Sequence, residues 1–457
     1  MLEEKARQAI LTVRAEAADR GTVATFLLHR EHSHLMRLGN SSVSLNTSET
    51  LTRLDVEVTE GWRQGSQTRL GEIASASDVR AAFEVALGKA RLAMEKDYQP
   101  LRDVVEEAVA EEVQHDEALA VLDPAVKAEA YRRVIAEVGE GYDYSGSWSS
   151  GVTEQYLVTT ANDREAWHRG TDQRFNVVLK HPRHRWELSD TQTGWRAADV
   201  AVERTVERLR NLLPVYEGAA AARTEPGRHT VLFGAEALAD IAGMAVWTGL
   251  WGRAWEEKVG WTAKEHPGDR ILGENINLSD DPTHDDTYRF GFDLSGQRRR
   301  PFPLVMAGRM VALMYDSVTA AKYGRTPTGH NLGNTSFALA TGDGPAGPLE
   351  AVRGLRRVLY IPALHYTHIP NPSEGLFTGS SRFNAVLVED GRIAGPIFST
   401  RITDTFRNVL GNVLLLSPTA VSVNQSDTYG RRSPVAMSVP AYAVVEGVHI
   451  TDSAEAF

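Results

Sequence analysis

Histidine, tyrosine and asparagine lie close together in the segment LHYTHIPNPSEG, residues 364–375. His365 and His368 are three residues apart, next to Tyr366 and near Asn371. Imidazole nitrogens bind metals and exchange protons near neutral pH, so this group could hold a metal ion or contact a substrate. A histidine pair on a loop also often only hydrogen-bonds the backbone. The segment is therefore a candidate substrate-contact site without a defined catalytic residue.

Three other polar clusters could do chemistry, but each also fits a simpler interpretation. HREHSH places His32 and His34 on one face of a strand, which could hold a metal, while Glu31 beside them favours a solvated sheet edge. PTHDD, at 282–286, joins an imidazole to two carboxylates but is typical of a polar loop. HPRHR, at 181–185, could bind an anion or could be the surface end of a strand.

Composition excludes several classes of function. The chain has no cysteine, which excludes disulfides, thiolate metal ligands and a cysteine nucleophile. There is no G-x-S-x-G elbow and no phosphate-binding loop. A net charge of -11 argues against nucleic acid as the main ligand. The N-terminus is amphipathic rather than signal-like and no long apolar run follows, so we expect a cytoplasmic protein without a membrane span.

A tryptophan series marks the segment AEALADIAGMAVWTGLWGRAWEEK, which predicts a helix from about residue 235. Trp247, Trp251 and Trp255 recur every four residues, with Met244 just before them. On one helix they would form a single stripe. Core packing and contact with a partner protein both explain such a stripe, since tryptophan is common in cores and at interface hot spots.

The elements that must position these groups fall into two parts. The segment EGAAAARTEPGRH, residues 217–229, has no periodicity and contains a Pro-Gly turn, so it indicates a boundary. We predict an α+β protein. Its N-terminal domain, 1–222, would be a sandwich of sheet and helices, and its C-terminal domain, 223–457, would be a β-rich, barrel-like antiparallel sheet with short helices.

Local signals give four more specific predictions. Residues 102–120 and the segment after Pro124 are expected to be helices. Asp390-Gly391 lies between two apolar runs and predicts a tight hairpin. DSVTAAKYG, residues 316–324, predicts a short helix with an aspartate cap and a glycine terminator.

The C-terminal segments, taken in order, resemble the TldD/PmbA family, whose members were once described as modulators of DNA gyrase. The matching segments are MVALMYDSVTAAKYG, RVLYIPALHYTHIPNPSEGLFTGSSRFNAVLVEDGRIAGPI, ITDTFRNVLGNV and SPVAMSVPAYAVVEGVHI. The N-terminal segment RLGNSSVSLNTSETLTRLDVEVTEGWRQGSQTRLG is a weaker match. The ordered set carries the resemblance, because none of the segments is diagnostic alone.

The resemblance also implies that the family contains two types of chain with different roles. TldD-type chains carry two zinc ligands and the general base in His-Glu-x-x-x-His, plus a cysteine ligand near the C-terminus. PmbA-type (TldE) chains lack these residues and pair with a TldD-type chain. Here the aligned helix has no histidine, and the cysteine position falls near SDTYGRR, at Tyr429. The resemblance thus implies no catalytic residue, no metal and no cofactor in this chain, with zinc in a TldD-type partner.

On this interpretation the chain is the silent half of a heterodimer that processes or degrades unfolded peptides, with the peptide held as an added strand on a sheet edge. The alternative is a divergent hydrolase that tailors small molecules or peptide natural products, with His365, His368 or Tyr429 in new roles. Ala- and Arg-rich helices would fit a high-GC bacterium. Direct action on DNA is disfavoured by the negative charge.

Overall fold

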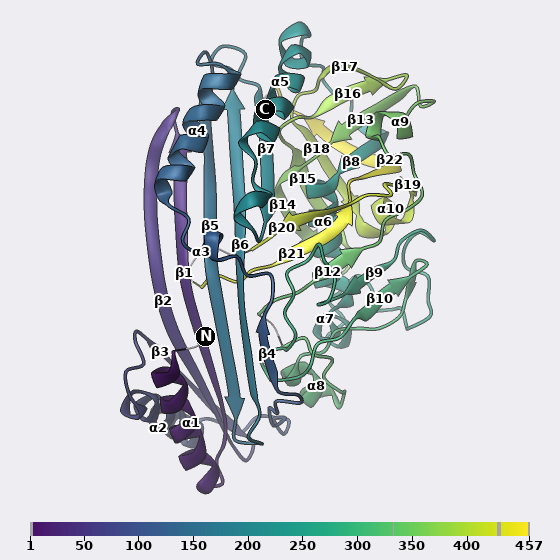
Figure 1. The fold of residues 1–457 in the computed structure, drawn as a ribbon. Coiled ribbons are helices and arrows are strands. Elements are labelled where there is room, and N and C mark those ends of the chain that lie inside the picture. Colours follow the sequence, from purple (N-terminus) through teal and green to yellow (C-terminus); the bar gives the residue numbers. More distant parts are fainter. Residues whose placement is uncertain (1–2, 332, 427–430, 456–457) are drawn as a thin grey trace.

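The computed structural model describes residues 3–331, 333–426 and 431–455. Within these residues the strands form three sheets of seven, six and nine strands, with helices packed around them (Figure 1). The predicted α+β fold class is confirmed, with sheet and helices in the N-terminal region and a β-rich C-terminal region. The boundary after residue 222 stays a prediction. The seven-stranded sheet ends at Gly194, and the strands of the other two begin at Gly227.

Long, mostly antiparallel strands build the seven-stranded sheet, in the order β3-β2-β1-β5-β6-β4 with β7 also paired to β6. Strands β1, β2, β5 and β6 run most of the height of the molecule in Figure 1. The strands are β1 (Val23–Gly39), β2 (Ser42–Glu60), β3 (Arg63–Leu70), β4 (Val109–Glu112), β5 (Asp143–Thr159), β6 (Glu165–Lys180) and β7 (Glu187–Gly194).

One face of this sheet is apolar and carries the helices. Phe26 and Leu28 of β1 pack with Leu54 of β2 against helices α1 and α2, and farther along the sheet Trp148 and Phe175 pack near α4. Strand alternation turns the intervening residues to the opposite face, toward the C-terminal region. The helices of this half are α1 (Glu4–Asp19), α2 (Ala76–Leu92), α3 (Glu117–Ala120), α4 (Pro124–Val138) and α5 (Val202–Gly218), with a 3₁₀ turn at Ala197–Asp199.

The helix predicted at 102–120 is wrong over most of its length. Only α3 is helical there, and β4 pairs in parallel with β6. The amides of Val104 and Glu106 instead donate to the carbonyls of Ser295 and Gly296, at 3.1 and 2.9 Å. These long-range backbone hydrogen bonds override the helix propensity of the glutamate- and alanine-rich sequence. The helix predicted after Pro124 is confirmed as α4.

Two further sheets make up the C-terminal region, and they are mostly antiparallel, with parallel pairs at β12–β21 and β8–β13. The six-stranded sheet has the order β11-β10-β9-β12-β21-β20. It comprises β9 (Leu278–Asp280), β10 (Phe302–Met306), β11 (Arg309–Met310), β12 (Phe337–Leu339), β20 (Ala420–Asn424) and β21 (Ala436–Pro440).

The nine-stranded sheet has the order β14-β15-β18-β22-β8-β13-β16-β17, with β19 also paired to β22. It comprises β8 (Gly227–Gly234), β13 (Arg357–Ile361), β14 (Leu364–Asn371), β15 (Leu376–Ser381), β16 (Val386–Glu389), β17 (Arg392–Pro396), β18 (Thr400–Thr405), β19 (Val413–Leu416) and β22 (Tyr442–Ser453). The helices here are α6 (Ala235–Ala245), α7 (Gly252–Glu256), α8 (Ser317–Tyr323), α9 (Pro348–Ala351) and α10 (Phe406–Gly411), with a π-helical turn at Val246–Leu250.

Two of the local predictions are confirmed in this region. Asp390 and Gly391 join β16 to β17 with φ angles of 48° and 74°, as a hairpin turn with two left-handed residues requires. Helix α8 is capped by Asp316, whose carboxylate accepts from the Thr319 amide at 2.7 Å, and it ends at Gly324 with φ 64°.

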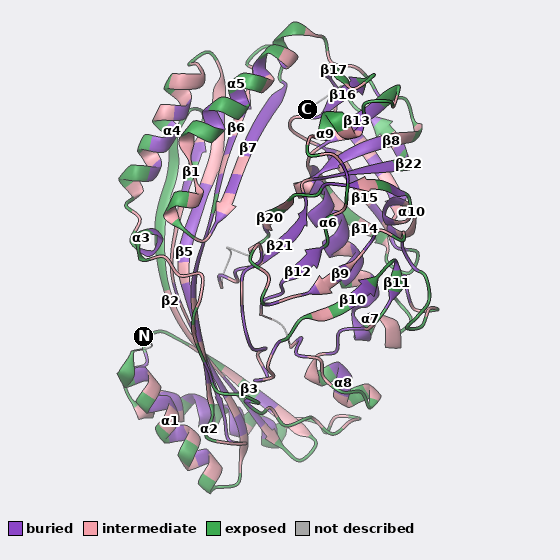
Figure 2. Cartoon of the chain, turned by 45° about the vertical axis from the view of Figure 1, so that its right-hand side comes forward, coloured by how far each residue is buried: buried purple, intermediate pink, exposed green. Residues whose placement is uncertain are grey.

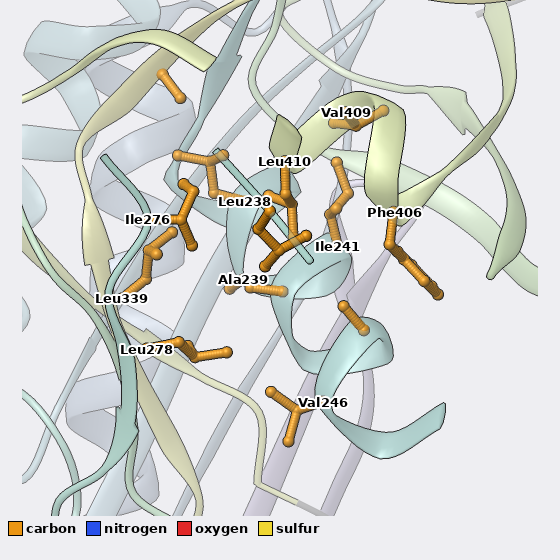
Figure 3. Packing of buried hydrophobic residues seen from close by; sticks show 14 of the residues in the cluster. Leu238, Ala239, Ile241, Val246, Ile276, Leu278, Leu339, Phe406, Val409 and Leu410 are labelled. Carbon is orange, nitrogen blue, oxygen red and sulfur yellow. The ribbon is translucent and has the colours of Figure 1, made fainter. Parts of the chain in front are cut away.

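Helix α6 lies inside the largest apolar cluster. Leu238 and Ile241 are fully buried, and Figure 3 shows them among side chains from other elements, including Leu278, Phe406 and Leu410. Burial rather than exposure of α6 is also plain in Figure 2. No helix in the described part of the chain is long and apolar enough to cross a membrane.

Candidate functional site

Helix α6, which the resemblance aligns with the zinc-ligand helix of TldD-type chains, is shorter than predicted. It ends at Ala245, and Trp251 adopts an extended conformation with φ −89° and ψ 124°. The Gly252 amide donates to the Met314 carbonyl at 2.7 Å, and the Met314 amide donates to the Leu250 carbonyl at 3.0 Å. Because this bridge occupies the backbone groups that a helix would use, the predicted continuous helix breaks at Trp251.

The break rearranges the predicted tryptophan stripe. Trp247 is 44% exposed and stacks on Trp251, which is 8% exposed, with ring centroids 5.1 Å apart. Trp255 instead donates its indole N–H to the Glu265 carbonyl at 2.9 Å. Met244 is half-buried against the apolar cluster. The series is therefore one stacked pair plus a separate ring, and a partner-contact role stays a prediction that now concerns Trp247.

A carboxyl group on α6 was missed by the sequence reasoning. Burial, and then the charge of Glu236, raise the pKa of Asp240 to about 7, against the opposing effects of Arg174 of β6 and of a hydrogen bond with Gln425. A carboxyl group with a pKa near 7 can donate or accept a proton at neutral pH. Its sequence signal was an acidic residue within the apolar run LADIAGMAV.

The chain after β20 is anchored to the first sheet by a buried ion pair. Arg432 donates to both carboxylate oxygens of Asp172, at 2.7 and 2.8 Å, and each side chain is about 2% exposed or less. Its guanidinium also donates to Ser149, and its backbone amide donates to the Glu31 carboxylate at 2.6 Å. Tyr429, predicted at the family's cysteine position, lies outside the described residues, but its flanking segment is thus held against β1, β5 and β6.

The solvated edge predicted at HREHSH is wrong. Strand β1 is central in its sheet, and Glu31 is 5% exposed. Its carboxylate is 2.9 Å from the ring of buried His29, and it also accepts from Arg432. His32 and His34 do share a face, with ring centroids 4.5 Å apart, and their Nδ1 atoms are hydrogen-bonded to threonine and serine hydroxyls of β2. The sequence correctly predicted that His32 and His34 share one face of the strand. It did not predict the contact between Glu31 and Arg432, because these residues are 401 positions apart in sequence.

The predicted substrate-contact site at residues 364–375 begins as strand β14, at the edge of the nine-stranded sheet, rather than as a loop. The Arg382 guanidinium donates to Nδ1 of His365 at 3.2 Å. Burial and then the Arg382 charge lower the pKa of His365. Both residues line an open cavity of about 250 Å³ together with Tyr366, which is 66% exposed.

The other two members of that cluster lie farther along β14. His368 is exposed and pairs with Thr378 of β15, and the Asn371 side chain accepts from the Ser373 hydroxyl at 2.8 Å. The structure therefore brings only His365 and Tyr366 into one cavity. His284 caps its own turn by accepting from the Asp286 amide, and HPRHR forms the turn after β6. Among the described residues, no group of three or more potential metal ligands is found.

The C-terminal region matches a known protein family. Residues 226–452 match the PmbA/TldA metallopeptidase C-terminal domain. This match places the C-terminal region of the chain in the PmbA/TldD family.

Individual relatives agree with this placement. A protein named metalloprotease from Methanothermobacter thermautotrophicus is 27% identical over 164 residues, which cover 32% of this chain and only about a third, 34%, of that protein. TldE from Thermococcus kodakarensis has a similar fold, with a TM-score of 0.82 and 17% identity over 97% of this chain and 100% of that one. A proposed modulator of DNA gyrase from Bacteroides thetaiotaomicron also has a similar fold, with a TM-score of 0.80 and 15% identity. The match covers 99% of this chain and 100% of that one.

Proposed function

We propose that this chain is a catalytically silent PmbA/TldE-type subunit that pairs with a TldD-type zinc metallopeptidase and helps it to process or degrade unfolded peptides. The observation that carries the proposal is the composition and burial of helix α6. A zinc peptidase site needs three protein ligands and an open coordination position. Helix α6 offers no histidine, and the chain has no cysteine.

The side chains that α6 carries instead are committed to packing. Ala239, Leu238 and Ile241 are fully buried in the apolar cluster, and Asp240 is engaged by Gln425. A buried apolar face stabilises the helix without any metal, because each buried leucine or isoleucine side chain contributes roughly 1.5–3 kcal/mol. The helix can therefore keep the fold of a metallopeptidase relative while contributing no zinc ligand.

An open strand edge supports the peptide part of the proposal. Strand β3 pairs with β2 only from Arg53 to Glu60, so residues 42–51 of β2 have no strand on their outer side within the described chain. This stretch contains no lysine and no proline, the residues that commonly block such edges. By contrast, the β14 edge contains Pro370 and two register irregularities. The β2 edge is thus the better template for an added peptide strand.

The test is reconstitution with a TldD-type chain from the same genome. We expect the two chains to co-purify as a complex, with zinc detected by elemental analysis in the partner only. The complex should cleave an unfolded peptide, and His365→Ala in this chain should leave that cleavage unchanged. Stoichiometric zinc in this chain alone, or partner activity that is the same with and without it, would refute the proposal. The expected cytoplasmic location stays a prediction.

The alternative, a divergent hydrolase, has one observation in its favour. Asp240 lies on α6 with a pKa of about 7, which suits a general acid or base. The same preparation separates the two candidates. Hydrolysis by this chain alone that disappears in Asp240→Asn would support the alternative, whereas hydrolysis that requires the partner and survives in Asp240→Asn supports the silent subunit.

A further inference from the structure

Two adjoining cavities lie between the β3 end of the first sheet and helix α8, which are neighbours in Figure 2. Their volumes are about 340 Å³ and 480 Å³. Tyr98, Val318 and Asn331 line both, so the two spaces share a wall. Each falls within the range of about 300–1,000 Å³ that is typical of ligand pockets.

The smaller cavity, which we call the carboxylate cavity, is lined by the sheet face opposite α1 and α2. Alternation along β2 turns Val56 into the core beneath α2 and exposes Asp55 and Glu57 to the cavity. Asp103 enters from the facing segment, and the Thr25 hydroxyl donates to its Oδ2 at 2.9 Å. The cavity is therefore bounded by carboxylates from two separate parts of the chain.

Two of these carboxyl groups have no ion-pair partner among the described residues. Arg53 is the basic residue of the lining, and its Nε donates to Asp55 at 2.7 Å. Glu57 accepts a hydrogen bond from the neutral Gln64 amide, at 2.9 Å, and the charge of Lys96 favours its ionised form. Burial, and then the neighbouring Glu57 charge, raise the pKa of Asp103 to about 8. A cation placed between Glu57 and Asp103 would favour the ionised form of both carboxyl groups, as an opposite charge does in a partly desolvated site.

The larger cavity, which we call the aromatic cavity, has a different lining. Trp251 and Tyr323 supply ring surface, while Lys322 and Arg253 both approach Glu257 at 3.8 Å or less. Asp97 and Asp316 also line this cavity, so it is charged as well as aromatic. A ligand that extends from the carboxylate cavity would meet the ring surface of Trp251 and Tyr323 here.

We propose that the carboxylate cavity binds the cationic side chain of a lysine or arginine in an extended peptide, whose adjoining residues lie in the aromatic cavity. The occupant is assigned by charge complementarity, since Glu57 and Asp103 are two carboxyl groups without an ion pair among the described residues. The adjoining aromatic cavity gives room for a chain longer than a free amine. The inference rests on the proposed function, because it names the class of peptide that the complex favours. It adds a preference for basic residues.

The test measures binding of labelled decapeptides to the full chain by fluorescence polarisation. The peptides differ only at one central position, which is lysine, its neutral analogue norleucine, or glutamate. We expect the lysine peptide to bind about tenfold or more tighter than the norleucine peptide, as charge-assisted hydrogen bonds would give. Asp103→Asn and Glu57→Gln should each reduce this ratio severalfold while leaving the norleucine peptide unaffected, which also reports that the variants are folded.

The matched control is Asp19→Asn, which removes one exposed carboxylate from α1 on the other face of the sheet and should preserve the ratio. Equal binding of the three peptides, or a ratio unchanged in Asp103→Asn, would overturn the inference. If n-butylammonium binds as tightly as the lysine peptide, the cavity is a site for small amines and the peptide assignment is wrong. If a reconstituted complex cleaves the lysine and norleucine peptides equally well, this inference is wrong, while the proposed function is unaffected.

Discussion

Lys127 of helix α4 is a lysine held in the interior without a carboxylate partner among the described residues. It is 1% exposed, and its ammonium donates to the Ser150 hydroxyl at 2.8 Å and lies 5.7 Å from the Trp148 ring centroid. Burial, and then the charge of Arg432, lower the pKa of Lys127 from 10.5 to about 7. We predict that Lys127→Met stabilises the protein at pH 7 and flattens its pH dependence.

The sign and size of the effect of Lys127 on the free energy of unfolding follow from proton linkage. Between about pH 7 and 10.5 the unfolded chain holds a proton on Lys127 that the folded chain has lost, so stability rises with pH across this window. Below pH 7 the penalty is fully present, at roughly 4–5 kcal/mol, and above 10.5 it vanishes. From pH 7 to pH 9 this lysine alone should add about 2 kcal/mol to the free energy of unfolding. Loss of the Ser150 hydrogen bond offsets about 1 kcal/mol of the gain in Lys127→Met.

The assay is urea denaturation at pH 7, 8 and 9, with Lys264→Met as the matched control at an exposed lysine. Subtracting the free energy of unfolding of Lys127→Met from that of wild type isolates Lys127 from the other titrating groups. The difference should shrink by about 2 kcal/mol between pH 7 and pH 9, and the control should show no such change. A difference that is constant across these pH values would refute the claim that the ammonium is buried without compensation.

Two further outcomes are expected. Asp172→Asn should lower the free energy of unfolding by about 3–5 kcal/mol, because it leaves the Arg432 charge buried without its partner, whereas Asp163→Asn at an exposed ion pair should cost less than about 1 kcal/mol in the same urea titration. Similar costs in the two variants would contradict this. Since Asp240 holds its proton up to about pH 7 in the folded chain and to 3.8 in the unfolded one, stability should fall as pH rises between these values, and Asp240→Asn should lose that slope.

Local sequence signals predicted those elements whose stability is local. The Asp390-Gly391 hairpin and the caps of α8 depend on backbone conformations and hydrogen bonds within a few residues, so residue type alone identifies them. The helix expected at 102–120 failed for the opposite reason. Its amides pair with carbonyls nearly 200 residues away in sequence, at Ser295 and Gly296, and no local pattern reports that partner.

The candidate site likewise has features that the sequence predicted and features that it did not. Family resemblance located helix α6 and the absence of histidine from it, because both are properties of one continuous segment. The break at Trp251 depends on a bridge to Met314, and the high pKa of Asp240 depends on its burial in the folded chain. The carboxylate cavity was missed for the same reason, since Glu57 and Asp103 come together only after the sheet and the segment that follows α2 have folded.

Several polar groups with shifted or compensated charges lie together in one part of the molecule. Glu57, Asp172 and Arg174 share the face of the first sheet that lies opposite its helices, where they meet Asp103, Arg432 and Asp240 from other segments. A boundary that served only to join two regions would gain more from apolar packing, because buried ion pairs contribute little net stability. Groups with perturbed pKa values concentrate instead where a ligand is handled. This polar face therefore supports a peptide-binding role for the space between the sheets better than a purely structural one.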